Sequence, residues 1–449
     1  MNDYFGITIG PIISTLSIAR KPRELWSASY LFSLLMETLI EEAVKLKIEI
    51  LSPAQETSCK SVGLFPDRLF CKMKEGVSIE TLVKNAKLEY TIKAGIPTDY
   101  FNIWITEISA PSDGEAVKNL NTQLNFLELQ NVALKEEEEA TVKELIAKQS
   151  VSLLFQRAFD SPYFRVGTLA EISTAQLKQI ADQENNNRYQ ICLQHAKKYE
   201  KTEDEDIFIQ LIKENFSNEF KTPHKYICIV HADGDNIGTI INTLPGEQIK
   251  ELSQRLIDFG GQASEKIKLF GGLPIYAGGD DLLFIAPIIS NDSNEKEQNI
   301  FDLIDELDQL FKDHKINEFK GKNEEGKALT PGMSYGLSIT YHKYPLYEAL
   351  TLSRDLLFKI AKKTEKKNAI AWTLQKGSGT SISGSFSKSN DPLKKAFYNL
   401  INSIDSYTLD GNLISAAAHK IKASEYLLKL FMGSKEEKDR LNAFVVEQK

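Results

Sequence analysis

The sequence has few of the residues that mark zinc-ribbon, disulfide-rich or membrane proteins. Its 449 residues include four cysteines, Cys59, Cys71, Cys192 and Cys228, with no C-x-x-C pair. This scatter predicts neither a zinc ribbon nor a disulfide framework and indicates reduced cytosolic thiols. No apolar run reaches roughly 18 residues, and no basic segment precedes an apolar leader, so we expect a cytoplasmic protein without membrane insertion or secretion.

The chain also lacks an excess of positive charge. Its formal net charge is −8, with 26% charged and 42% hydrophobic residues. These values are typical of a globular protein and argue against a surface built throughout for nucleic acid, although local basic patches remain compatible with them. The length predicts two to four domains.

The N-terminal pattern predicts a first α+β domain over residues 1–99. Tyr4–Ile9 is rich in strand-forming residues, and Pro22 suits the first turn of a helix with apolar residues at helical spacing. Lys47–Leu51 is expected to form a strand, and Ser61–Lys72 a hairpin that turns near Pro66-Asp67.

A second strand–helix–strand–strand series is expected within residues 222–376. The predicted elements are strand Tyr226–His231, helix Gly246–Leu269, a strand through Tyr276, strand Leu282–Ala286, helix Ile300–Lys315, strand Met333–Tyr341, a helix from Pro345 and strand Ala369–Leu374. This order is ferredoxin-like, the architecture of the palm domains of many polymerases and cyclases.

The other regions are expected to be helical or to link domains. Residues 100–221 have a mainly helical pattern, and Glu136–Glu139 is interpreted as a solvated helix face in preference to an interaction patch. The Ser- and Gly-rich stretch Gly377–Asn390 predicts a linker, followed by a helical domain over 391–449 with Asp391 as a helix N-cap. The predicted fold class is α+β, with two ferredoxin-like palm domains and helical middle and C-terminal domains.

Two acidic motifs are the strongest functional signal. Gly278-Gly279-Asp280-Asp281 lies between apolar strands and predicts a hairpin tip, whereas Asp233-Gly234-Asp235 ends an earlier strand. Alone, the tip is more often a plain turn. A βαβ unit can place both motifs side by side, and hard carboxylate oxygens then suit Mg²⁺ and phosphoryl chemistry.

Residues around these motifs have two open interpretations. Asn236 and Gly238 continue the first motif into a loop able to direct N–H groups at phosphate oxygens. A cluster of basic residues ends the helix that begins at Pro345: Lys359, Lys362, Lys363, Lys366 and Lys367. These lysines either favour the helix C-terminus or reach a triphosphate. His231 is interpreted as a packed residue.

The order of several short motifs resembles the large palm-polymerase subunit of type III CRISPR effector complexes, especially the Cmr type. In chain order they are Ile9-Gly10-Pro11, Ala19–Tyr30, Phe65–Phe70, His231–Gly238, the Gly278–Asp281 tip, Ser334–Ser338, His342–Leu346 and Ala361-Lys362. The resemblance covers most of the chain.

This resemblance implies an active second palm and a degenerate first palm. Gly10-Pro11 stands where the second palm has its aspartates, and Pro66-Asp67-Arg68 replaces Gly279-Asp280-Asp281. We expect Mg²⁺ or Mn²⁺ ligands and catalytic residues in the second palm: Asp233, Asp280 and Asp281, with Gly234 as a further ligand. Nucleotide contacts are expected from Gly234, Asp235, Asn236, Gly238, Gly278, Gly279, Ser334, Lys362 and Lys366.

The resemblance also implies an activity and partners. Family members, in complexes with other effector subunits and guide RNA, bind target RNA and then join ATP into cyclic oligoadenylate second messengers. Some members join ATP to S-adenosylmethionine instead. No His-Asp dipeptide occurs here, so the HD nuclease of many relatives, and with it DNA cleavage, is not expected. The alternatives are a stand-alone diguanylate-type cyclase and a catalytically silent nucleotide-binding scaffold.

Overall fold

The computed structural model describes residues 2–55, 62–95, 98–129, 146, 168–197, 204–292, 296–323, 325–364, 367–377, 379–388 and 392–405. The chain divides into two compact units, Met1–Ser387 and Lys388–Lys449. In the second unit the described part is helix α15 (Pro392–Asp405), in agreement with the predicted helical stripe. The expected N-cap Asp391 lies outside the described residues.

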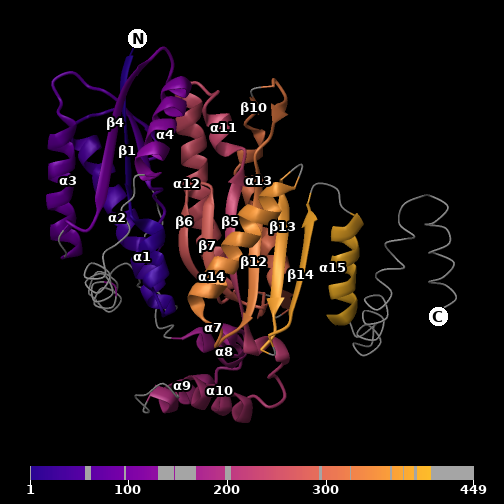
Figure 1. Ribbon diagram of the computed structural model, residues 1–449. Helices are drawn as coiled ribbons and strands as arrows, with labels where there is room; N and C mark the ends of the chain where they lie inside the picture. Colours follow the sequence, from indigo (N-terminus) through magenta and orange to yellow (C-terminus); the bar gives the residue numbers. More distant parts are fainter. Residues whose placement is uncertain are drawn as a thin grey trace, which may run out of the picture. The chain divides into compact units, whose positions relative to one another are not determined.

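The first sheet has the ferredoxin-like strand order predicted from the N-terminal pattern. Its order is β2-β3-β1-β4, with antiparallel neighbours throughout (Figure 1). Helices α1 and α2 connect β1 to β2, and α3 connects β3 to β4, which gives a β-α-β-β-α-β sequence. The elements of this palm are β1 (Asn2–Gly10), α1 (Ile12–Ile18), α2 (Pro22–Lys45), β2 (Ile50–Ser52), β3 (Arg68–Lys72), α3 (Ile79–Ala94), β4 (Asn102–Ala110) and α4 (Asp113–Leu129).

Two expectations for this region are wrong. Strand β4 lies beyond residue 99, in the stretch expected to be helical, because it pairs with the whole length of β1. Ser61–Lys72 does not form a hairpin among its described residues. Only β3 is a strand there, and Gly63 instead bridges in parallel to Tyr276 of the second palm.

The second palm repeats the same strand order. Its sheet runs β14-β13-β12-β5-β7-β6, so β12-β5-β7-β6 reproduces the arrangement of the first palm with two strands added. The principal elements are β5 (Tyr226–Asp235), α11 (Ile237–Ile241), α12 (Gly246–Leu269), β6 (Leu273–Gly278), β7 (Asp281–Pro287), α13 (Ile300–Asp313), β12 (Gly332–Tyr341), α14 (Leu346–Asp355), β13 (Ala369–Gln375) and β14 (Ser381–Ser387). Every strand and helix predicted for this region is confirmed to within a few residues.

Short elements complete this palm. Strands β8 (Ile289–Asn291) and β9 (Glu297–Asn299) pair, as do β10 (Gly321–Lys322) and β11 (Ala328–Leu329). The 3₁₀ turns are η2 (Thr222–Lys225) and η3 (Ile316–Glu318). Helix α14 continues without a break into the π-helix η4 (Leu356–Ile360) and the 3₁₀ turn η5 (Ala361–Lys363).

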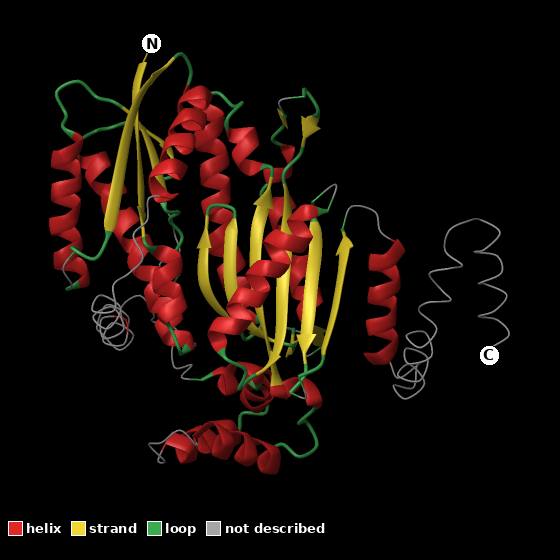
Figure 2. Ribbon diagram, in the orientation of Figure 1, coloured by secondary structure: helices red, strands yellow, loops and turns green. Residues whose placement is uncertain are grey.

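Helices cover both faces of the six-stranded sheet (Figure 2). Neighbouring residues of β12 show this, because successive side chains of a strand point to opposite faces. Tyr335 donates to Asp308 of α13 at 2.8 Å. Gly336 lies against Ser353 and Leu357 on the α14 side, where a Cβ would come within 2.2 Å of the Ser353 carbonyl oxygen. The sheet is therefore covered on both faces, as the apolar run Tyr226–Val230 predicted for β5.

The two palms share a hydrophobic core. Leu25 and Trp26 of α2 are buried together with Ile229 and Leu283 of the second sheet and Leu346 of α14. This cluster fixes the first palm against the second through side chains far apart in sequence. Helix α2 is consequently buried along most of its length.

The expected linker at Gly377–Asn390 is largely a strand. Residues of β14 pair antiparallel with β13 from Ala369↔Ser387 to Gln375↔Ser381. Phe386 is buried, and the hydroxyls of Thr373 and Ser383 lie 2.8 Å apart. Alternation of Ser and Gly with Ile and Phe is compatible with an edge strand, and pairing here covers an otherwise open edge of β13.

Beyond β4 and α4, the described part of the middle region is helical, as predicted. It comprises α7 (Leu169–Ser173), α8 (Ala175–Gln183), α9 (Arg188–Lys197) and α10 (Asp204–Asn215). Glu136–Glu139 lies outside the described residues. No helix in the described ranges has the length and apolar character needed to cross a bilayer.

Candidate active site

The two acidic motifs meet at one end of the second sheet, as predicted. Asp233 on β5 is the direct cross-strand partner of Asp281 on β7, and such pairs place their side chains on one face of a sheet. Asp280 lies in the turn before β7, and its carbonyl oxygen accepts a hydrogen bond of 3.0 Å from the N–H of Gly234. The backbone thus ties the first motif to the hairpin tip.

The glycines of these motifs are required by close contacts and backbone conformation. A Cβ on Gly234 would lie 2.6 Å from the Asp280 Cβ and 2.8 Å from Cγ1 of Ile237. Gly279 has a φ of 65°, a left-handed conformation that costs glycine little. Gly278 lies against the ring of Tyr276, where a Cβ would be 2.3 Å from the tyrosine oxygen. These positions therefore shape the tip, and the structure gives Gly278 a packing role.

The carboxylates of the site favour the protonated form of one another, which raises their pKa values. Burial raises the pKa of Asp280 to about 7, and the charge of Asp233 adds to the increase. Asp281 is open to solvent on one side, but the protein around it and then the charges of Asp233 and Asp280 raise its pKa well above the ordinary value. Burial also raises the pKa of Asp233, although the charge of Lys362 opposes this. Such a cluster favours a cation.

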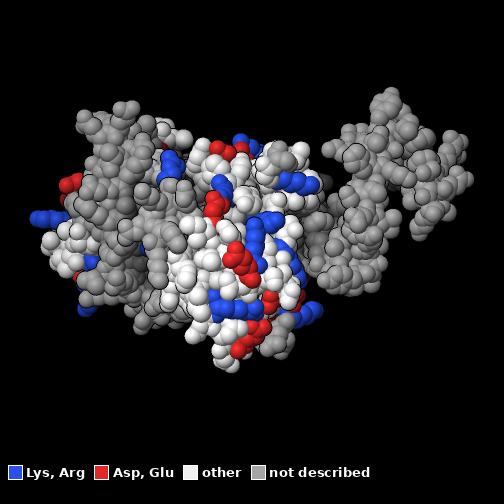
Figure 3. All heavy atoms as spheres, turned by 90° about the horizontal axis from the view of Figure 1, so that it is seen from below, with Lys and Arg blue, Asp and Glu red and all other residues white. Residues whose placement is uncertain are grey.

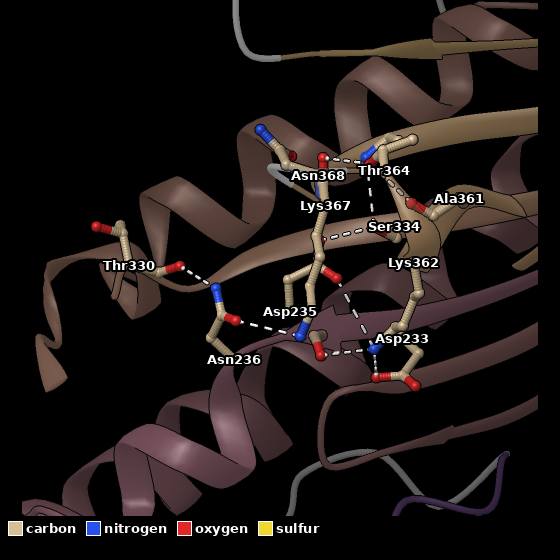
Figure 4. A network of polar contacts seen from close by, with 12 residues as sticks. Asp233, Asp235, Asn236, Thr330, Ser334, Ala361, Lys362, Thr364, Lys367 and Asn368 are labelled. Atoms are coloured by element: carbon tan, nitrogen blue, oxygen red, sulfur yellow. Dashed lines mark hydrogen bonds and ion pairs between the residues drawn. The ribbon is translucent and has the colours of Figure 1, made fainter. Parts of the chain in front are cut away.

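A lysine supplies a positive charge at this point (Figure 4). The Nζ atom of Lys362 forms an ion pair with Oδ1 of Asp233 and donates to the carbonyl oxygen of Gly234 at 2.9 Å. Its distance to Oδ1 of Asp235 is 3.8 Å. The structure thus brings Lys362 to the acids of the predicted site. Lys366 lies outside the described residues.

Asp235 has internal partners that sequence reasoning did not anticipate. Its side chain is buried, and Oδ2 accepts hydrogen bonds from the Ser334 hydroxyl at 2.7 Å and from the Asn368 N–H at 2.6 Å. Ser334 also accepts from the N–H of Ala369 at 3.3 Å. Both Asp235 and Ser334 had been expected to contact nucleotide. In the structure, their hydrogen bonds join β5, β12 and the segment before β13.

Asn236 extends this network to the segment that precedes β12. It has a left-handed φ of 68° at the start of α11. Its amide donates to the carbonyl of Thr330 at 3.1 Å and accepts from Nζ of Lys367 at 3.2 Å. Gly238 is different, because nothing lies within 4 Å of a Cβ placed there. Of the predicted loop, Gly238 is therefore the position left open for a ligand.

The residues fit a divalent cation in their chemistry. Asp233, Asp280 and Asp281 supply carboxylate oxygens and Gly234 a carbonyl oxygen, the hard donors that Mg²⁺ and Mn²⁺ accept. Repulsion among the carboxylates would be relieved by such an ion. Among the described side chains no three His, Cys, Asp or Glu are already grouped as ligands. The ammonium of Lys362 contacts part of this donor set instead.

A cavity of about 470 Å³ opens beside the acidic tip and lies between the two palms. The second palm contributes Gly238, Asn242, Asp280 and Asp281, and the first palm contributes the turn at Pro66–Arg68 with Asn121 and Asn125 of α4. This volume is in the range of small-molecule sites. The walls present carboxylates from the second palm, and amides, a guanidinium and the Asp67 carboxyl group from the first.

The first palm repeats the backbone of the site but keeps only one of its three acids, because Asp67 stands at the place of Asp280. Ile9 donates to the carbonyl of Asp67 at 3.1 Å, as Gly234 does to Asp280. The register pairs Thr8 with Arg68, as it pairs Asp233 with Asp281. Thr8 and Gly10 therefore take the places of Asp233 and Asp235. Gly10-Pro11 was expected to stand in place of the aspartates, and the structure supports this for Gly10, with Thr8 as the other position. The replacement of Gly279-Asp280-Asp281 by Pro66-Asp67-Arg68 agrees with the register.

The guanidinium of Arg68 fills the degenerate site. It donates to both carboxylate oxygens of Glu128 at 2.9 Å and to the amide oxygens of Asn121 and Asn125 at 2.7 Å. Thr8 donates to the same Glu128 at 2.6 Å. A fixed internal cation thus stands where the second palm carries Asp281. Sequence reasoning missed Asn121, Asn125 and Glu128, although their i, i+4 and i+7 spacing marks one helix face.

A second cavity of about 370 Å³ lies on the α14 side, and its walls are mainly apolar. Asp67 and Asp281 line both cavities. His231 lines this one as well, with Nδ1 2.7 Å from the Ser353 hydroxyl. Burial, with the charge of Arg354, lowers the pKa of His231 to about 3. The imidazole is thus neutral, which agrees with its interpretation as a packed residue.

Positive charge is not concentrated on the lower face of the molecule. In the view from below, Lys and Arg lie among Asp and Glu (Figure 3). Ion pairs such as Lys343–Asp206 and Arg188–Glu219 account for this mixing in the described residues. The described residues of that face therefore form no basic patch of the kind that a nucleic-acid backbone requires.

Two protein-family models match the chain and together cover more than half of it. "Cas10/Cmr2, second palm domain" matches residues 226–371, and "CRISPR-associated protein Cmr2, N-terminal" matches residues 4–99. These ranges contain the two sheets with equivalent strand order. The acidic tip lies in the second of them.

Individual known proteins are also similar to this chain. The CRISPR system Cmr subunit Cmr2 of Pyrococcus furiosus is 31% identical over 193 residues, which cover 36% of this chain and 20% of that protein. The chain therefore matches only about a fifth of that relative's length. The type III-B Cmr-beta structure in its apo state has a TM-score of 0.63 at 12% identity, covering 99% of this chain and 77% of that one. The target-RNA-bound Cmr-beta structure matches with a TM-score of 0.63 at 11% identity, covering 100% and 78%. These structural matches establish the fold.

Proposed function

Because the chain belongs to the Cas10/Cmr2 family, we propose that it is a nucleotidyltransferase subunit of a type III CRISPR effector complex. In this proposal, binding of target RNA to the guide-RNA complex activates synthesis of an adenylate second messenger from ATP. The product is a cyclic oligoadenylate or a conjugate of ATP with S-adenosylmethionine. The observation that carries the proposal is the pairing of Asp233 with Asp281 beside Asp280 in one palm only.

The second palm supplies the proposed metal ligands. Asp233, Asp280, Asp281 and the carbonyl of Gly234 would hold Mg²⁺ or Mn²⁺, and bound ions would stabilise charge on the attacking and leaving oxygens. Gly238, at the exposed start of α11, leaves room for phosphate oxygens near the backbone. Lys362 is the basic side chain within reach of the same carboxylates and would steady the triphosphate of ATP, with Lys366 as a further candidate.

The first palm contributes a wall and no second metal site. Arg68 already neutralises Glu128 there, so the cavity is lined on this side by donors of low net charge. An acceptor nucleotide lying in the 470 Å³ cavity would be positioned by this wall against the acidic tip. Holding two reactants in such an arrangement is itself a large source of catalysis.

The test is mass spectrometry of products made by the full effector complex. ATP is supplied with Mg²⁺ or Mn²⁺, guide and target RNA, with and without S-adenosylmethionine. We expect an adenylate-derived product that depends on target RNA and disappears in the Asp280→Ala, Asp281→Ala double variant. Absence of product, or activity that survives the double variant, would contradict the proposal. RNA-independent turnover of GTP alone would indicate a stand-alone cyclase, and metal-independent binding without turnover would indicate a silent scaffold.

A further inference from the structure

The ammonium of Lys362 lies where a cation is most strongly favoured. It contacts a carboxylate oxygen of Asp233 and the carbonyl oxygen of Gly234, and Asp235 lies 3.8 Å away. Only 17% of the Lys362 side chain is exposed, and 19% of Asp233. Partly buried charges are weakly screened by solvent, so this contact is stronger than a surface ion pair.

The segment that carries Lys362 is anchored to the same strand as the acids (Figure 4). Helix α14 changes to π and then 3₁₀ geometry before Lys362, and π-turns often occur at functional positions. Lys367 and Asn368 have left-handed φ angles of 49° and 47°. They are held by Asn236 and Asp235, respectively. Lys362 thus lies in a helical turn, contacts with residues at and just after the end of β5 hold the residues at 367 and 368, and the lysine side chain reaches Asp233.

Lys362 and a divalent ion use the same oxygen atoms. Asp233 and the Gly234 carbonyl belong to the donor set expected to hold the metal, and each is in contact with the ammonium. An ammonium is a compact cation with donors in several directions and can satisfy these oxygens by itself. A metal ion at the same oxygens would replace those hydrogen bonds and repel the ammonium.

We propose that Lys362 is a resting-state cation of the acidic site, which must leave Asp233 and Gly234 before a divalent metal binds there. This inference rests on the proposed function, because it places the metal at the same carboxylates. The lysine then has two alternative partners, the carboxylate cluster and the phosphates of a bound nucleotide. Its position on the chain keeps Lys362 within reach of both partners. Because nucleotide phosphates can take up the displaced ammonium, we expect metal and nucleotide to bind together in preference to metal alone.

The experiment is calorimetric titration of MnCl₂ into the full-length chain without nucleotide. Lys362→Met removes the charge and keeps most of the side-chain volume, so we expect Mn²⁺ affinity to rise about tenfold or more. Lys362→Arg keeps a positive charge and is expected to stay within about threefold of the wild type. The matched control is Lys359→Met, because Lys359 pairs with Asp355 on its own helix at 2.7 Å and should leave Mn²⁺ affinity unchanged.

An unchanged or lower affinity in folded Lys362→Met, verified by circular dichroism, would overturn the inference. So would an increase of the same size in Lys359→Met. A lysine that only steadies triphosphate predicts no change in nucleotide-free metal binding. Product formation by the wild-type complex is measured separately. If that complex makes the messenger but Lys362→Met binds Mn²⁺ with the affinity of the wild type, the resting-state role is overturned and the proposed function stands.

Discussion

The N–H of Gly234 donates to the carbonyl oxygen of Asp280 at 3.0 Å. This bond joins the two acidic motifs through the backbone, before any side chain is considered. Its counterpart in the first palm, from Ile9 to Asp67, shows that the backbone geometry is a property of the fold. What differs between the palms is the side chains that this geometry presents.

We expect Gly234→Ala to disable the site while Gly238→Ala is tolerated. The new Cβ at position 234 would lie 2.6 Å from the Asp280 Cβ, so the tip must shift, at a cost of about 1–3 kcal/mol in the free energy of unfolding. At position 238 nothing lies within 4 Å and the N–H is kept. Urea denaturation and product assays should separate the two variants. Equal effects would show that the contact with Asp280 is unimportant.

The stability of the metal-free chain should depend on pH through Asp280. Its pKa is about 7 in the folded chain against an ordinary value of 3.8. Between these values the folded chain binds more protons than the unfolded chain, so its free energy of unfolding falls as the pH rises from about 4 to 7. Above pH 7 this loss is complete. Asp281 acts in the same direction.

Asp280→Asn removes that contribution. In EDTA, we expect the melting temperature of the variant to exceed that of the wild type at pH 8, with the difference shrinking toward pH 5. Scanning fluorimetry across this range measures the difference. Asp313→Asn is a matched control, because Asp313 lies at the exposed end of α13 and accepts a hydrogen bond from Gln309. Parallel curves for Asp280→Asn and the wild type would contradict the expectation.

Arg68 should stabilise the first palm through the geometry of its guanidinium. It bonds to Glu128, Asn121 and Asn125 of α4, a set of directions that a lysine cannot reproduce. Arg68→Lys is therefore expected to lose about 1–3 kcal/mol in urea denaturation despite keeping the charge. Arg20→Lys is the control and should lose much less, because the exposed Arg20 side chain donates to the Ser17 carbonyl at 3.5 Å, a weak contact that a lysine can replace. Similar losses would assign the effect to charge alone.

Two buried serines of β12 should respond differently to loss of the hydroxyl. Ser334 donates to Asp235 at 2.7 Å, so Ser334→Ala leaves a buried carboxylate with one hydrogen bond fewer, at a cost of about 1–3 kcal/mol. Ser338 is equally buried but its hydroxyl has no hydrogen-bond partner in the described structure, so Ser338→Ala should be close to neutral. Thermal unfolding measures both, and a larger loss at Ser338 would count against the Asp235 network.

Much of the second palm could be predicted because its signals are local. Helix Gly246–Leu269 was predicted with the bounds observed for α12, since apolar spacing and terminal residues define a helix within one segment. The hairpin tip at Gly279 follows in the same way from residues adjacent in sequence. The strand order then brings Asp233 and Asp281 together, as expected for a ferredoxin-like palm.

The errors arose where a distant partner decides the structure. Ser381–Ser387 has the composition of a linker, but the open edge of β13 makes it a strand. Asn102–Ala110 lies in a helical region of the sequence, and pairing with β1 makes it the fourth strand of the first sheet. Local propensity is weak compared with the hydrogen bonds and burial that such pairing provides.

The amino-acid sequence by itself determined which residue types are available and where. One palm has three acids beside flexible glycines, and the other has an arginine in the corresponding motif. Only the tertiary structure decided that Asp235 and Ser334 bond to each other, that Arg68 is neutralised by Glu128 of α4, and that Lys362, 129 positions along the chain from Asp233, pairs with it. The physical reason is that burial and partner choice depend on atoms brought together by folding. Charge and backbone freedom, in contrast, are carried by each residue alone.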